Sequence, residues 1–155
     1  MLAGSLRDIW ELAVTTDWIA LPGSPTLEER SEPYLVRASE GARLRGYLAS
    51  AGARVVDVNI GESQNLVDVI GSLKEVLQFP SWCGSGWDSV SDAFSELRAA
   101  WPLPLAIVVV GLPRLMAERR HLALNTVLGL SRLCEEFSIA GDQVLVFYVD
   151  ERSEA

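Results

Sequence analysis

The chain has 155 residues, of which 49% are hydrophobic and 22% are charged, a balance typical of one globular domain and not of a disordered segment. Its 21 acidic and 13 basic residues give a net charge of −8, which argues against direct nucleic-acid binding, because that function usually needs a basic surface. An acidic protein can instead attract a basic partner by electrostatic steering.

Hydropathy and cysteine usage predict a cytoplasmic protein. The longest uncharged run, residues 99–113, contains three prolines and is shorter than the roughly 20 residues of a membrane-spanning helix. Charges at positions 7 and 8 are not typical of a signal peptide. Cys83 and Cys134 have neither a disulfide framework nor metal-ligand spacing, so we expect two reduced thiols.

The first third of the chain contains weaker signals of secondary structure. A short amphipathic helix is predicted at 5–14 and a short strand at 33–38. A helical segment at 44–51 should end at Gly52, because glycine commonly follows the last helical residue. We expect residues 1–53 to form an N-terminal extension packed on the main domain.

Clear periodicity begins at residue 54. Apolar and polar residues alternate at 55–60, which predicts a half-buried strand ending at Gly61. Residues 105–110 are all apolar, which is typical of a strand buried on both faces. The helix predicted before the second strand, at 66–77, follows from apolar residues at helical spacing: Leu66, Val69, Ile70, Leu73 and Leu77.

The last part of the chain is predicted to contain a basic turn of helix, an amphipathic helix and a strand. The amphipathic helix should end at Gly141, and 144–149 should form the last strand before a polar tail at 151–155. The basic turn carries Arg114, Arg119, Arg120 and His121.

Residues 54–150 therefore have the order β-α-α-β-α-α-β, in which each helical connection is long enough for a parallel crossover. This order predicts an α/β domain with a small three-stranded parallel sheet packed with helices. The half-polar strand at 55–60 should lie at an edge, and the apolar strand at 105–110 should lie in the middle.

The most unusual segment follows a glycine-rich loop at 80–86. In the predicted helix after it, Asp88, Asp92 and Glu96 are the only charges up to residue 97. Their i, i+4, i+8 spacing places them on one face, where like charges destabilise a helix slightly. A Ser85-x-x-Asp88 capping pattern would explain Asp88. A solvated helical face would explain the other two acids.

Catalytic and metal-binding interpretations of this segment have little support. The run from Cys83 to Trp87 is similar to the surroundings of a papain-type nucleophile, but glycine stands at the nucleophile's position and His121 is the only histidine. Asp88 and Asp92 lack the further ligands of a metal site. We therefore expect no catalytic residue, no metal and no cofactor.

Residues 79–92, preceded by a strand and an apolar helix, resemble the barstar family's core motif Leu-Pro-x-aromatic-x-Gly-x-Asn-x-Asp-x-Leu-x-Asp. The later strand order, with Gly141 before the last strand, agrees. The resemblance covers residues 54–150 and implies a barstar-like fold. Barstar-like proteins are intracellular inhibitors of small secreted ribonucleases, whose active sites they occlude with an acidic helix and the loop before it.

The resemblance implies a partner-binding surface centred on Asp92, which would occupy the phosphate-binding pocket of the nuclease. Asp88 would be a second acidic contact and Glu136 a peripheral one. Trp82 would lie over the mouth of the active site, and Gly84 would allow a close backbone approach. The complete expected set is Trp82, Gly84, Gly86, Trp87, Asp88, Ser91, Asp92, Glu96 and Glu136.

Three positions depart from the family pattern. Gly86 stands where the family has asparagine, Ser91 where it has tryptophan, and Leu97 where it has an aromatic residue. We expect a cytoplasmic inhibitor of a small basic microbial ribonuclease, a monomer that forms a 1:1 complex. The alternatives are an immunity protein against a different toxin class and a non-inhibitory binding module of the same fold. An enzyme is the least favoured interpretation.

Overall fold

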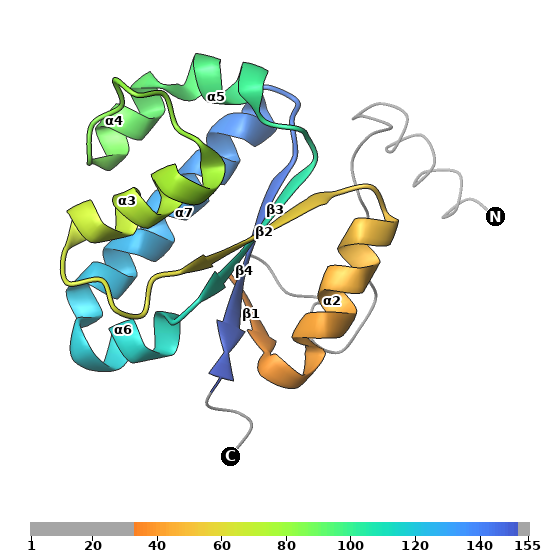
Figure 1. The fold of residues 1–155 in the computed structure, drawn as a ribbon, viewed down its shortest axis with the longest axis vertical. Helices are drawn as coiled ribbons and strands as arrows, with labels where there is room; N and C mark the ends of the chain where they lie inside the picture. Colours follow the sequence, from red (N-terminus) through yellow and green to blue (C-terminus); the bar gives the residue numbers. More distant parts are fainter. Residues whose placement is uncertain (1–32, 152–155) are drawn as a thin grey trace, which may run out of the picture.

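A parallel four-stranded sheet with helices on both faces forms the centre of the molecule in a computed structural model that describes residues 33–151 (Figure 1). The strand order is β1-β4-β3-β2. The strands are β1 (Tyr34–Arg37), β2 (Arg54–Asn59), β3 (Leu105–Val110) and β4 (Val144–Asp150). The helices are α2 (Ala38–Ser50), α3 (Leu66–Leu77), α4 (Trp87–Asp92), α5 (Phe94–Ala100), α6 (Leu112–Glu118) and α7 (Arg120–Ile139).

The three strands predicted after residue 54 are confirmed, with β2 at an edge and β3 inside the sheet. The short strand predicted at 33–38 is confirmed as β1. It pairs with β4 as a fourth strand, so the predicted sheet of three strands is wrong. β1 has only four residues, so its pairing with a distant strand, more than its own pattern, determines its place. The division of the chain into an N-terminal extension at 1–53 and a main domain from residue 54 stays a prediction. The helix predicted at 5–14 and residues 152–155 of the polar tail lie outside the described residues.

Apolar side chains of the two inner strands point alternately to the two faces of the sheet. Ile107 and Val146 belong to the larger core, which α3, α5 and α7 cover, whereas Ala106 and Phe147 belong to a smaller core beneath α2. Figure 1 shows α2 alone on its side of the sheet, with the remaining helices on the opposite side. The loop before α4 therefore lies on the same side of the sheet as α7.

Two predicted glycine helix ends are confirmed. Gly52 and Gly141 have φ of +95° and +93°, and the backbone N–H of the residue after each bonds back to the last turn of α2 or α7, as in a Schellman motif. The start of α2 was not predicted, because the helix begins at Ala38 without a capping side chain at Arg37.

The acidic segment forms two short helices instead of the single one predicted. Ala93 ends α4 and precedes α5, so Asp88 and Asp92 lie on one helix and Glu96 on the next. The predicted capping role of Ser85 is wrong, because Gly86 occupies the N-cap position and no side chain caps the helix. Asp88 does lie in the first turn of α4, where a negative charge is favourable.

Candidate functional site

The loop at 80–86 is held in place by contacts to α3 and α4. Lys74 of α3 donates from Nζ to the backbone carbonyl of Cys83 at 2.6 Å, and the Cys83 N–H bonds to the Pro80 carbonyl at 3.0 Å. Gly84 lies so close to α4 that a Cβ there would be 2.5 Å from the hydroxyl oxygen of Ser89. Glycine at position 84 thus allows the loop to pack closely against α4.

Trp82 is exposed at the tip of this loop, with 55% of its surface accessible. Its indole N–H donates to the Glu96 carboxylate at 3.0 Å. Glu96 is therefore more than a solvated acid, because it fixes the orientation of a large aromatic ring at the surface. A tryptophan with one apolar face exposed and its N–H satisfied is suited to contact another protein.

Trp87, the first residue of α4, anchors that helix on α7. Its indole N–H donates to Oδ1 of Asn125 at 2.7 Å, and its ring lies against Gly129, where a Cβ would be 2.0 Å from the ring atom Cε2. The side chain is partly buried against the larger core. Trp87 therefore holds α4 against α7, whereas the side chain of Trp82 is exposed to solvent.

Asp88 and Glu136 are brought together by Arg132 of α7. The Asp88 side chain is 95% exposed, and its Oδ1 lies 3.8 Å from Nη1 of Arg132. The Nε of Arg132 lies 3.9 Å from Oε1 of Glu136. Ser91 donates its hydroxyl to the same Glu136 oxygen at 2.8 Å. Two of the predicted acidic contacts thus share one arginine.

Asp92 differs from both of these acids. It is exposed at the end of α4, and within residues 33–151 its carboxylate has no hydrogen bond and no ion pair. A negative charge at a helix C-terminus is slightly unfavourable. Burial raises the pKa of the nearby Cys83 thiol; the Lys74 ammonium opposes this rise, and the Asp92 carboxylate adds to it. Asp92 therefore has no stabilising partner in the described chain.

Together these contacts assemble the predicted residues into one surface, called here the acidic face. It consists of the 80–86 loop, α4, the first turn of α5 and the adjoining side of α7. Leu97, by contrast, is 1% exposed in the core. Four supporting residues were not predicted: Lys74, Asn125, Gly129 and Arg132. Gly129 lies in the middle of the long helix predicted after residue 121, and a glycine inside a helix can indicate that another group packs closely against it.

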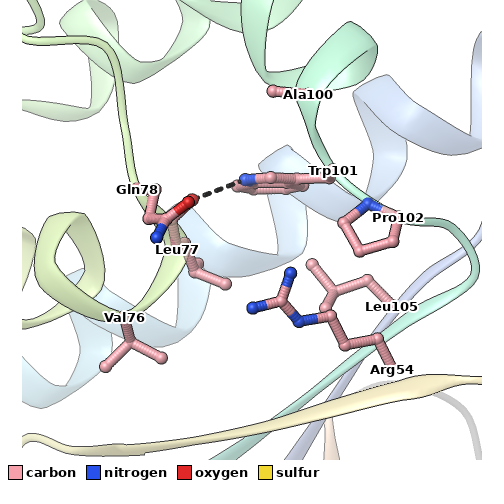
Figure 2. A pocket seen from close by; sticks show the side chains of 8 residues that line it. All are labelled: Arg54, Val76, Leu77, Gln78, Ala100, Trp101, Pro102 and Leu105. Atoms are coloured by element: carbon pink, nitrogen blue, oxygen red, sulfur yellow. Dashed lines mark hydrogen bonds between the residues drawn. The ribbon is translucent and has the colours of Figure 1, made fainter.

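Two hollows in the described part of the surface lie away from the acidic face. One small pocket lies where α3 ends and β3 begins; there Arg54 points toward the ring of Trp101, whose N–H donates to the Leu77 carbonyl at 2.8 Å (Figure 2). A shallow groove lies beside α3, between Glu62 and Glu75. None of the predicted contact residues lines either hollow.

The part of the chain at 33–151 also contains no group of three potential metal ligands. No helix in that part has both the length and the apolar character needed to cross a membrane.

Comparison with known protein families adds an independent finding. The family described as Barstar (barnase inhibitor) matches residues 53–149. This range includes all elements from β2 to β4 except Asp150, the last residue of β4. No curated protein matches the chain. The matched region contains the whole acidic face.

Proposed function

The chain belongs to the barstar family, and on this premise we propose that it inhibits a small basic microbial ribonuclease by covering the enzyme's active site with the acidic face. The description of the family names it as an inhibitor of barnase. In this proposal Asp92 enters the phosphate-binding pocket, Asp88 and Glu136 contact basic groups around it, and Trp82 covers the mouth of the site.

The exposed carboxylate of Asp92, which is unpaired within residues 33–151, is the observation that carries the proposal. A carboxylate resembles a phosphate group in charge and in its capacity to accept several hydrogen bonds. Because no cation within residues 33–151 neutralises Asp92, a partner's arginines or lysines can bind it without first breaking an internal ion pair. The net charge of −8 would also accelerate the encounter with a basic enzyme.

The fixed loop supports protein binding over catalysis. Lys74 holds the loop backbone, and Glu96 holds the Trp82 ring, so little conformational freedom is lost when a partner binds. Asp88 is almost fully exposed, whereas catalytic carboxylates are commonly found in concave pockets. An acidic surface that carries a fixed aromatic ring is suited to insert into another protein's cleft.

The proposal is tested by measuring RNA cleavage by barnase, and by basic ribonucleases captured from the culture medium of the source organism, with and without this protein. We expect Asp92→Asn to weaken inhibition at least about tenfold, because a hydrogen bond to a charged group contributes about 1.5–3 kcal/mol and 1.4 kcal/mol corresponds to tenfold. The matched control is Glu75→Gln, which removes the same charge from the exposed face of α3. Equal inhibition by Asp92→Asn and the wild-type protein would refute the mechanism.

A second candidate function is immunity against a toxin of another class through the same face. It is favoured by Ser91, which stands where the family has tryptophan and is engaged with Glu136 inside this chain. A toxin captured from the medium that is not a ribonuclease, and whose binding is still lost in Asp92→Asn, would select this candidate.

A further inference from the structure

Arg132 is the one basic side chain in the described structure that lies within ion-pair distance of Asp88 and Glu136 on the acidic face. It projects from α7 and lies 3.8 Å from an Asp88 oxygen and 3.9 Å from a Glu136 oxygen. The two acids come from different helices, so a single guanidinium compensates both. Asp92 is left without such compensation.

The ion pairs of Arg132 contribute little to the stability of the fold. Both separations exceed the roughly 2.7–2.9 Å of a strong charge-assisted hydrogen bond. The Arg132 side chain is 58% exposed and that of Asp88 is 95% exposed, so solvent strongly screens this pair. The Glu136 side chain is only 28% exposed, but its 3.9 Å separation from Arg132 is too long for a hydrogen bond. The position of this charge therefore matters more for an approaching partner than for folding.

We propose that Arg132 is a specificity-determining residue, which weakens the attraction of partner cations to Asp88 and Glu136 and so makes binding depend chiefly on the charge that a partner places opposite Asp92. This inference rests on the proposed function. A partner's basic group that approaches Asp88 or Glu136 must displace the guanidinium or approach it closely, and either event opposes binding. A partner whose positive charge is concentrated opposite Asp92 meets no such opposition.

The experiment uses barnase as the probe and measures association rates at several ionic strengths. We expect Arg132→Gln to associate about two- to fivefold faster at low salt, because one like charge a few ångströms from a partner cation is removed, with a smaller gain at high salt. Arg132→Lys should retain most of the wild-type rate. The matched control is Arg120→Gln, which removes the same charge from the exposed start of α7 and should change the rate less than twofold.

A double-mutant cycle tests whether Arg132 acts through Asp88. In an Asp88→Asn background the gain from Arg132→Gln should decrease, because a partner cation is no longer drawn to that position. Thermal melting of each variant shows whether it is folded. An unchanged or slower rate for Arg132→Gln, an equal gain for Arg120→Gln, or no barnase binding by either the wild type or Arg132→Gln would each overturn the inference.

These outcomes are distinguishable from failure of the proposed function. If Asp92→Asn loses partner binding while Arg132→Gln changes nothing, only the role of Arg132 is wrong. If Asp92→Asn binds as the wild type does, the acidic face itself is not the binding surface and both proposals fall.

Discussion

Replacing Gly129 by alanine should displace Trp87 and, with it, α4. The new Cβ would lie 2.0 Å from Cε2 and 2.3 Å from Cδ2 of the Trp87 ring, whereas nonbonded carbons prefer about 3.5–4.0 Å. The ring would have to move by about 1.5–2 Å, and such a movement breaks its 2.7 Å hydrogen bond to Asn125.

The magnitude follows from three opposing contributions. Overpacking a filled site costs about 1–3 kcal/mol, and loss of the hydrogen bond costs about 1 kcal/mol. Alanine has a higher helix propensity than glycine by about 1 kcal/mol, which offsets part of this cost. We expect Gly129→Ala to lower the free energy of unfolding by about 1–3 kcal/mol.

Gly71 provides a matched control in another helix. A Cβ at this position of α3 meets nothing within 4 Å, so Gly71→Ala should raise the free energy of unfolding by about 0.5–1 kcal/mol. Urea denaturation followed by circular dichroism measures both variants. If Gly129→Ala is as stable as Gly71→Ala, then Trp87 does not anchor α4 against α7, and the argument for how the acidic face is positioned is wrong.

Two further predictions concern the loop before α4. Gly86 lies at the N-cap of α4, and a Cβ at this position would meet nothing within 4 Å. Gly86→Asn, which introduces the residue that the family has there, should raise the free energy of unfolding by a few tenths of a kcal/mol in a denaturant titration. A marked loss of stability would contradict this interpretation of the loop. Burial raises the pKa of the Cys83 thiol above its ordinary value, so this thiol ionises first in the unfolded chain. Stability should therefore fall as the pH rises above about 8.5, by at most about 1.4 kcal/mol per pH unit between the unfolded and folded pKa values. Cys83→Ala should remove this part of the loss. An unchanged pH dependence in Cys83→Ala would refute the assignment.

The sequence by itself determined the parts of the fold that depend on local patterns. Burial on two faces requires the all-apolar run of β3, and an amphipathic helix requires the apolar spacing seen in α3. A positive φ favours the glycines that follow α2 and α7. Each of these elements could therefore be predicted from neighbouring residues. The family pattern in 79–92 also indicated which segment carries the acidic face.

Contacts between distant residues decided what local patterns could not. The sequence predicted a strand at 33–38, but only its pairing with β4 places β1 in the sheet. The Trp87 ring is held on α7 by Asn125 and Gly129, 38 and 42 positions away (125 − 87 and 129 − 87). The pairing of Arg132 with Asp88 likewise joins two helices. Sequence spacing indicates which residues would share a face of an unbroken helix. Only the tertiary structure shows that the acidic helix is interrupted at Ala93 and which side chains meet across elements. For that reason the three acids, alike in the sequence, differ in the structure: Glu96 holds Trp82, Asp88 faces an arginine, and Asp92 has no hydrogen bond or ion pair within residues 33–151.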